Sequence, residues 1–190
     1  LMPTHRNSRK GISFAFQQPV HFKGLTVKDL ITIAAGKEMS VNEICDILSE
    51  VGLCAREYID REINGSLSGG ELKRIEIAMI TARGTKLSIF DEPEAGIDLW
   101  SFSMLIEQFE KIHKEKKESL VLISHQERII QMADRIMVMN SGRIVDQGDF
   151  HHILHHAKDP YTRLLVEKRM AVMDRYRDIL KREERKPCLN

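Results

Sequence analysis

Two acidic residues that directly follow a short apolar run are the strongest candidates for chemistry in this sequence. The run is Leu87–Phe90, and Asp91 and Glu92 come immediately after it. A strand there would place both carboxylates at its carboxyl end, the edge at which α/β folds bind ligands. The first acid can hold a hydrated Mg²⁺, and the second can take a proton from an attacking water. The pair predicts a hydrolytic site, with a strand that merely ends in a polar turn as the alternative.

The sequence Leu67-Ser68-Gly69-Gly70-Glu71 is a second candidate site, because it can begin a helix whose first backbone N–H groups are not covered by side chains. Ser68, followed three residues later by Glu71, forms a capping box, which predicts a helix N-terminus at this point. Glycines leave the first N–H groups of a helix unshielded, and such groups bind phosphate. An ordinary capped helix with a flexible entry is the alternative.

Further polar residues stand where strands or turns would end. Gln17 follows the apolar run Ile12–Phe16, and Asp98 follows a glycine turn. His125 lies two residues after the run Leu120–Ile123, with Ser124 between them. A histidine at the tip of a strand can hydrogen-bond a phosphate, although a lone histidine is more often structural.

Alternating strands and helices are needed to position these residues. We expect strands at 12–16, 87–90, 120–123, 135–139 and 143–145, and helices at 40–51, 68–82 and 99–114. Ser40 and Glu43 form another capping box, and Gly52 is placed to close that helix. Asn140-Ser141-Gly142 is a turn signal. Strands separated by helices imply an α/β fold, with a parallel sheet covered on both faces.

Composition narrows the class of protein. The 190 residues carry 29 Lys+Arg and 28 Asp+Glu, which excludes a long polyelectrolyte and a nucleic-acid wrapper. No apolar run approaches the roughly 18 to 20 residues of a membrane span, and the start lacks a signal-peptide pattern. Three cysteines form no C-x-x-C pair and no even disulfide framework. We therefore expect a soluble, cytoplasmic, globular protein.

The order and spacing of these motifs, from about residue 11 to about residue 150, resemble the ATP-binding-cassette (ABC) ATPases. The resemblance implies a P-loop-type α/β core, ATP and Mg²⁺ as cofactors, and a head-to-tail dimer with a second ABC subunit. It assigns Gln17 to the Q-loop, which senses Mg²⁺ and the attacking water, and His125 to the switch. Asp91 and Glu92 become the Walker B pair, in which Asp91 orders Mg²⁺ and Glu92 is the catalytic base.

The same resemblance gives the remaining motifs roles at the dimer interface. Leu67 to Glu71, with Ser68, Gly69 and Gly70 at their centre, become the signature that contacts ATP held by the partner subunit. Asp98 becomes the D-loop residue. One departure is large: the chain has no G-x-x-x-x-G-K-[ST] phosphate loop, and only sixteen residues precede Gln17. We expect this sequence to be a piece of a longer ATPase. The alternative is a natural non-hydrolytic subunit that supplies a signature surface to another ATPase.

Two details point to different branches of the family. Glu71-Leu72-Lys73-Arg74-Ile75-Glu76, and the stretch Phe14 to Val20, resemble the ATPase subunit of the SUF iron–sulfur assembly machinery, whose partner is a soluble scaffold protein. Asp159-Pro160-Tyr161-Thr162 resembles peptide and nickel importer ATPases, whose partner is a membrane permease. The second branch would place the protein at the membrane. Cassette proteins of DNA maintenance are excluded, because fifty residues between Gln17 and Leu67 leave no room for their coiled coil, and we expect no nucleic-acid partner.

The expected organisation is a partial cassette at 1–158 and a C-terminal extension at 159–190. Within the cassette we expect a helical subdomain at about 20–66 and the signature-to-switch region at 67–150. The extension predicts an amphipathic helix at 161–184, either packed on its own domain or presented to a partner or membrane surface. Four histidines, His151, His152, His155 and His156, have i, i+4 spacing, which allows a two-ligand metal site or simply a polar helix surface.

Overall fold

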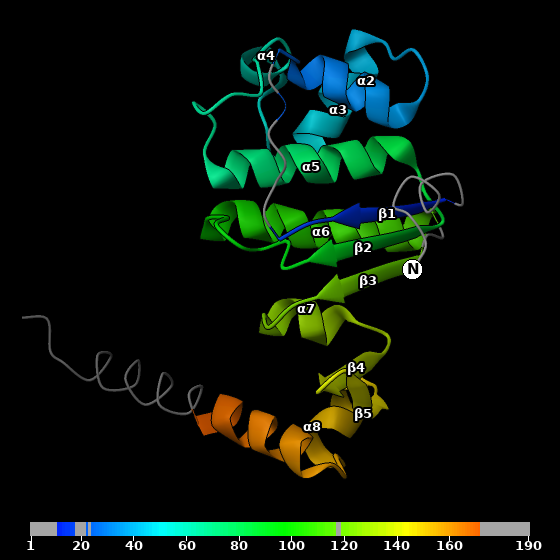
Figure 1. The fold of residues 1–190 in the computed structure, drawn as a ribbon, viewed down its shortest axis with the longest axis vertical. Helices are drawn as coiled ribbons and strands as arrows, with labels where there is room; N and C mark the ends of the chain where they lie inside the picture. Colours follow the sequence, from blue (N-terminus) through cyan, green and yellow to red (C-terminus); the bar gives the residue numbers. More distant parts are fainter. Residues whose placement is uncertain (1–10, 18–21, 23, 117–118, 172–190) are drawn as a thin grey trace, which may run out of the picture. The chain divides into compact units, whose positions relative to one another are not determined.

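A computed structural model describes residues 11–17, 22, 24–116 and 119–171 (Figure 1). These residues belong to two compact units, of which the first ends at Ile129 and the second begins at Ile130. Each unit is described by itself. All of the expected strands are present, four of them within one residue of their expected bounds, and the last extends three residues further, to Gly148.

A parallel three-stranded sheet forms the base of the first unit. Its strands are β1 (Ile12–Ala15), β2 (Leu87–Asp91) and β3 (Ser119–Ile123), in the order β1-β2-β3. Ala15 pairs with Phe90, and Phe90 pairs with Leu122. The carboxyl ends of all three strands therefore meet at one edge, which confirms the predicted α/β fold with a parallel sheet.

The segment between β1 and β2 contains a group of short helices, as predicted. They are α2 (Val27–Ala35), α3 (Val41–Glu50) and α4 (Ala55–Tyr58). Thr26 and Ser40 each begin a helix through a complete capping box, and Gly52 takes a left-handed conformation with φ 72° directly beyond the α3 C-cap. Buried aliphatic side chains such as Ile31, Ile44 and Leu48 hold the group together.

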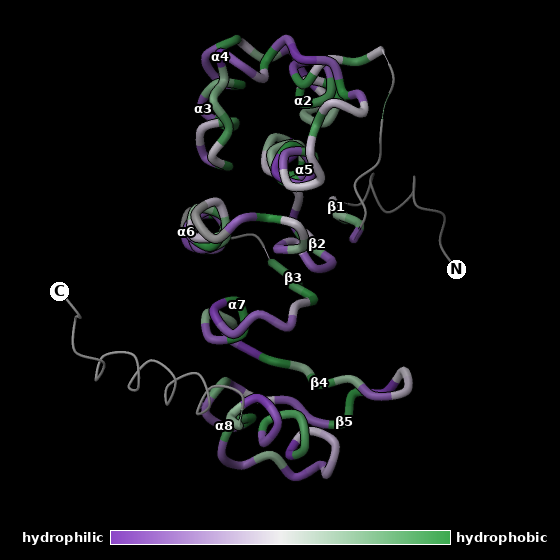
Figure 2. Tube along the Cα trace, turned by 90° about the vertical axis from the view of Figure 1, so that its left-hand side faces the viewer, coloured by the Kyte–Doolittle hydropathy of each residue, from purple (hydrophilic) through white to green (hydrophobic). Residues whose placement is uncertain are grey.

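Helix α5 (Gly69–Arg83) joins this helical group to the sheet. It packs on α2 and α3 on one side and on β1 on the other. Seen along its axis in Figure 2, α5 lies between the α2–α3 pair and the strands. Its buried residues point in several directions, since both sides of the helix are covered; they are Leu72, Lys73, Ile75, Ile77, Ala78, Ile80 and Thr81.

Helix α6 (Leu99–Lys116) covers one face of the sheet. The rings of Phe90 on β2 and Phe109 on α6 are both fully buried and pack edge to face, with centroids 4.9 Å apart. On the opposite face, Phe14 and Ile123 are 41% and 50% exposed. Within the described part of the chain, the expectation of helices on both faces is therefore met on one face only.

The described part of the second unit contains an antiparallel hairpin followed by two helices. Its strands are β4 (Ile136–Asn140) and β5 (Arg143–Gly148), joined by the predicted turn, in which Ser141 and Gly142 have positive φ. Helix α8 (Phe150–His155) and a helix at residues 160–171 follow. Helix α7 (Glu127–Met132) spans the division between the units.

The expected helix at 161–184 is present up to residue 171, and its remainder lies outside the described residues. The predicted domain boundary at 158/159 stays a prediction. No helix in the described ranges is both long and apolar enough to span a bilayer.

Candidate functional site

The sheet edge brings Gln17 and Glu92 into direct contact. The Gln17 side-chain amide donates a 2.9 Å hydrogen bond from Nε2 to Oε2 of Glu92, across 75 residues of sequence. Gln17 lies two residues beyond β1, and Glu92 lies one residue beyond β2. Parallel pairing of the two strands therefore creates the contact.

Glu92 has an unusual backbone conformation. Its φ is 45°, in the left-handed region that a residue with a Cβ seldom adopts. Its N–H nevertheless continues the sheet by donating to the carbonyl oxygen of Ile123 at 2.9 Å. The chain therefore turns sharply while still attached to β3. Such strained positions cost roughly 1 to 3 kcal/mol and cluster at functional sites.

His125 lies next to Glu92. Its Nδ1 is 3.8 Å from Oε1 of Glu92 and 4.0 Å from Oε1 of Glu94, and two thirds of the side chain is exposed. Glu94, which the sequence analysis did not single out, is buried and accepts a hydrogen bond from the Ser124 hydroxyl. Three residues from three different segments, Gln17, Glu92 and His125, thus lie together at one edge of the sheet.

The signature sequence forms the N-terminus of α5. The Ser68 hydroxyl accepts the Glu71 N–H at 3.2 Å, and the Ser68 N–H donates to Oε2 of Glu71 at 2.6 Å, which completes the predicted capping box. Leu67 is buried beneath the turn, whereas Ser68 and Gly69 are exposed. The first backbone N–H groups of the helix are thus open to an anion, the geometry that a phosphate requires.

Gly70 is the position at which the signature touches the segment that follows β2. A Cβ added to Gly70 would lie 2.7 Å from the carbonyl oxygen of Gly96, closer than real Cβ atoms come to backbone. At Gly69 the same construction meets nothing within 4 Å. The second glycine is therefore required by packing, and the first is not.

Asp98 caps the next helix. Its carboxylate accepts hydrogen bonds from the N–H of Ser101 at 3.0 Å and from the Ser101 hydroxyl at 2.7 Å. Arg74 on α5 also donates to that hydroxyl, at 3.2 Å, and to the Gly70 carbonyl at 3.3 Å. The predicted D-loop residue is thus tied through Ser101 and Arg74 to the helix that carries the signature.

Glu71 is ionised well below neutral pH. The Tyr58 hydroxyl donates to Oε1 of Glu71 and is the main reason that its pKa falls from 4.5 to about 2, against the opposing effect of partial burial. The hydrogen bonds with Ser68 and the charge of Arg61 act in the same direction. Glu71 therefore carries a negative charge at neutral pH, at the positive end of the α5 dipole.

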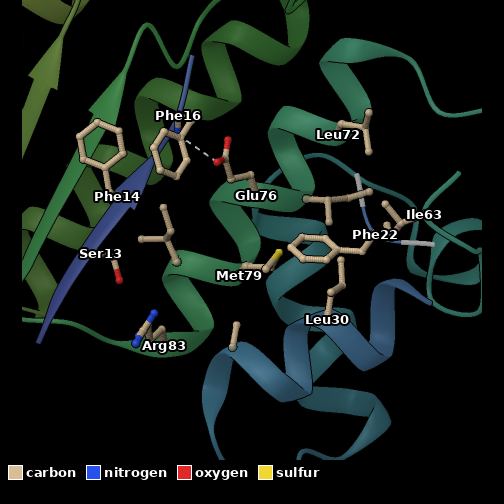
Figure 3. A pocket seen from close by; sticks show the side chains of 13 residues that line it. Ser13, Phe14, Phe16, Phe22, Leu30, Ile63, Leu72, Glu76, Met79 and Arg83 are labelled. Atoms are coloured by element: carbon tan, nitrogen blue, oxygen red, sulfur yellow. Dashed lines mark hydrogen bonds between the residues drawn. The ribbon is translucent and has the colours of Figure 1, made fainter. Parts of the chain in front are cut away.

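Two charged residues of α5, Lys73 and Glu76, contact the main chain of Phe16, which precedes Gln17. The sequence analysis used both residues only to compare branches of the family. Glu76 accepts the N–H of Phe16 at 3.0 Å, the contact drawn in Figure 3, and Lys73 is only 1% exposed. Burial raises the pKa of Glu76, while the charge of Lys73 and the Phe16 N–H oppose that rise. A buried lysine is rare unless it is paired, and this burial depends on segments remote in the chain, so no local sequence signal marks it.

An apolar cavity of about 190 Å³ adjoins these contacts. Phe14, Phe16 and Phe22 form one part of its lining, and α5 contributes Met79 and Glu76 (Figure 3). Arg83 also lines the cavity.

Comparison with known proteins identifies the family. The family model described as ABC transporter matches residues 2–95. An uncharacterised ABC transporter ATP-binding protein of Methanocaldococcus jannaschii is 36% identical over 148 residues, which are 75% of this chain and 59% of that protein. The chain belongs to the ABC ATPase family. This cassette is also 31% identical to the dipeptide transport ATP-binding protein DppD of Escherichia coli, over 78% of the chain and 46% of DppD.

A third relative and two solved structures agree with that assignment. The energy-coupling factor transporter ATP-binding protein EcfA2 of Bacillus cereus is 33% identical over 80% of the cassette chain and 53% of its own length. The chain thus spans about half the length of the curated relatives it matches.

The solved structures share the fold of this cassette. A dimeric ATP-binding cassette in a post-hydrolysis state, bound to ADP and Pi, aligns with a TM-score of 0.67 at 21% identity, over 78% of this chain and 68% of that one. A bacterial Atm1-family ABC exporter with ATP bound aligns at 0.73 and 20% identity, over 85% of this chain and 28% of that one.

The cassette edge offers ligands suited to MgATP. Carboxylate and amide oxygens from Asp91 and Gln17 are the hard donors that Mg²⁺ takes, and the open N-terminus of α5 suits a phosphate. The histidines of α8 are less suited to a metal. The rings of His151 and His155 are 4.8 Å apart, but the described residues contain no group of three or more His, Cys, Asp or Glu side chains arranged to hold an ion.

Proposed function

We propose that this chain supplies the signature, Walker B and switch parts of an ATPase that hydrolyses MgATP between two head-to-tail subunits. The observation that carries the proposal is the Gln17–Glu92 hydrogen bond of 2.9 Å, with His125 beside the same carboxylate. A carboxylate held by an amide at the carboxyl edge of a parallel sheet is placed to bind and deprotonate a water.

Each residue of the edge then has a distinct task. Glu92 accepts the proton of the attacking water, and Gln17 holds the Glu92 carboxylate through its amide. Asp91 is the residue that would hold Mg²⁺, which when bound neutralises charge on the phosphates. His125, exposed beside Glu92, donates a hydrogen bond to the terminal phosphate. Residues Ser68 to Gly70 present backbone N–H groups to the ATP of the other subunit.

The proposed partner is a membrane permease of an importer, which places the protein at the cytoplasmic face of the membrane. The supporting findings are the relatives named for dipeptide transport and for an energy-coupling factor transporter. The sequence Asp159-Pro160-Tyr161-Thr162 supports the same branch. In the structure, the Asp159 carboxylate caps the helix at 160–171 by accepting the N–H groups of Tyr161 and Thr162.

Iron–sulfur cluster assembly with a SUF-like scaffold is the second candidate. The observation in its favour is the pair Glu71 and Glu76, which replaces the residues usual in transporter ATPases. Both glutamates make specific contacts, Glu71 with the Ser68 N–H and Glu76 with the Phe16 N–H. None of the relatives reported above is named for iron–sulfur assembly.

The first experiment is to purify the complete protein from its native source and measure its intact mass, its companions and its ATP turnover. A mass above 21.9 kDa with ATP turnover is expected, and a co-purifying integral membrane protein supports the importer. A soluble companion supports the scaffold branch instead. A mass of 21.9 kDa without turnover, together with rescue of hydrolysis by a second ATPase, would replace the enzyme by the non-hydrolytic subunit.

A second experiment tests the composite site directly. The variant Glu92→Gln of the complete protein should bind ATP and remain dimeric on gel filtration, because the nucleotide is not consumed. The unmodified protein should return to monomers as ATP is exhausted. A Glu92→Gln variant with normal turnover would refute the assignment of the catalytic base.

A further inference from the structure

The side chain of Lys73 contacts both of the segments that carry the proposed hydrolytic pair, Gln17 and Glu92. Its Nζ donates to the main-chain carbonyl oxygen of Phe16 and, at 3.3 Å, to that of Asp91. Phe16 immediately precedes Gln17, and Asp91 immediately precedes Glu92. One ammonium group thus binds the peptide that leads into each of the two side chains that hydrogen-bond to one another.

Glu76, one turn further along α5, completes this arrangement. Its Oε1 accepts the N–H of Phe16 at 3.0 Å, and its Oε2 lies 3.4 Å from the Lys73 ammonium. The N–H and the carbonyl of Phe16 are therefore both held by α5, by Glu76 and Lys73 respectively. Figure 3 shows the Glu76 side chain reaching from α5 to Phe16. We call Lys73 and Glu76 the α5 clamp.

The burial and the contacts of the α5 clamp indicate that it holds other segments in place. Lys73 is 1% exposed, and its ammonium donates two hydrogen bonds, to the Phe16 and Asp91 carbonyl oxygens. It also forms an ion pair with the Glu76 carboxylate, whose buried Oε2 accepts no hydrogen bond. Burying a charged pair is seldom the most stable solution for a core, and a pair of apolar residues would often do as well. The pair is thus better explained by what it holds in place.

The clamp sits on the same helix as the signature. Lys73 is three residues from Gly70, which is roughly 4.5 Å along a helix axis. Because a helix moves as a stiff body over one turn, a displacement of its N-terminus also moves the Lys73 ammonium and with it both peptides. The signature end and the clamp are therefore mechanically continuous.

From this geometry we propose that Lys73, supported by Glu76, is a positioning residue that couples the signature helix to the Gln17–Glu92 pair of its own subunit. Engagement of the signature by the nucleotide of the partner subunit would thereby set the alignment of the hydrolytic pair in this one. The proposal rests on the proposed ATPase function and assigns no chemical step to Lys73.

The test compares Lys73→Met with the double variant Lys73→Met/Glu76→Gln in the complete protein. Lys73→Met leaves the partly buried Glu76 carboxylate without its ion-pair partner, so the melting temperature of the variant should fall. The double variant carries no unpaired charge, and its melting temperature should return towards that of the parent. Its kcat should nevertheless remain at least about tenfold low, with a KM for ATP within about twofold, because misalignment affects chemistry more than binding.

Lys114→Met is the matched control, since Lys114 is exposed and pairs with Glu110 one turn away. It should leave kcat, KM and melting temperature unchanged. A double variant that recovers the parent kcat together with the parent melting temperature would overturn the proposal, because Lys73 would then serve stability alone.

Amide hydrogen exchange provides a readout that does not depend on hydrolysis. In the double variant the peptides that contain Phe16–Gln17 and Asp91–Glu92 should exchange at least about tenfold faster, while the α3 peptide should not change. Unchanged exchange at both peptides would overturn the role of Lys73, whether or not the parent hydrolyses ATP. Absence of hydrolysis in the parent, with faster exchange in the variant, would refute the proposed function and leave the clamp supported.

Discussion

The two halves of the candidate site are built in different ways. The signature turn at Ser68 to Glu71 is fixed by hydrogen bonds between residues three apart in sequence. The Gln17–Glu92 pair is fixed by a hydrogen bond across 75 residues, and the Lys73 contacts that hold its two segments span 57 and 18 residues. A local motif and a tertiary assembly thus make up the proposed site, and α5 carries both the signature and the side chains that hold the second half.

The largest effect on ATP turnover is expected at the Gln17–Glu92 pair. Glu92→Gln should lower kcat by about 10² to 10⁴, because general-base catalysis contributes on that scale. The matched control is Glu107→Gln on the exposed surface of α6, which should leave the rate unchanged. Steady-state ATP hydrolysis by the complete protein checks both variants. Equal rates for the two would remove Glu92 from the mechanism.

The next largest effect, on stability, is expected where Gly70 of the signature approaches Gly96, in the segment that follows β2. Gly70→Ala places a Cβ 2.7 Å from the Gly96 carbonyl, so one of the two backbones must move. Overpacking of this kind costs typically about 1 to 3 kcal/mol. Denaturant unfolding should report that loss, and ATP-dependent dimerisation should weaken with it.

Gly69→Ala is the control for this prediction, because a Cβ at Gly69 meets nothing within 4 Å. It should unfold like the parent. If both alanine variants have the same free energy of unfolding, the close approach of Gly70 to Gly96 has no energetic weight.

A smaller effect separates local structure from function. Ser68→Ala and Ser40→Ala each remove the serine of a complete capping box, so each should lower the free energy of unfolding by about 1 kcal/mol. Only Ser68→Ala should also lower ATP turnover, because only that helix end faces the proposed nucleotide. Equal losses of turnover in the two variants would mean that the signature serine acts through stability alone.

The smallest effect concerns pH. Glu71 has a folded pKa of about 2 against a reference value of 4.5, so its ionised form favours the folded state. Its contribution is present in full above pH 4.5 and is lost as the pH falls towards 2. Tyr58→Phe removes the main cause of the lowered pKa and should flatten the dependence of unfolding free energy on pH in that window. An unchanged slope between the parent and Tyr58→Phe would contradict this origin.

Local patterns in the sequence were sufficient for much of the fold. Capping boxes at Ser40 and Ser68, and the turn at Ser141–Gly142, are correct because their determinants lie within a few residues of one another. The residues at the sheet edge were also predictable, because the carboxyl ends of parallel strands lie at the same edge of a sheet. The hydrogen bond between Gln17 and Glu92 follows from that topology, but the two segments that it joins come from distant parts of the chain.

The roles of Lys73, Glu76 and Glu94 were not predictable from their own sequence neighbourhoods. In a one-dimensional sequence Lys73 and Glu76 form an ordinary i, i+3 pair of the kind found on solvated helix surfaces. Their burial depends on β1 and β2 packing against α5 from elsewhere in the chain.

By itself, then, the sequence determined the family, the α/β order of elements and the identity of the residues at the sheet edge. All of these depend on short motifs and on periodicity. Only the tertiary structure decided which faces of α5 are buried, which peptides Lys73 holds and why Gly70 has no room for a side chain. These properties depend on close approaches between segments that are remote in the chain, and a residue's type does not specify its distant neighbours.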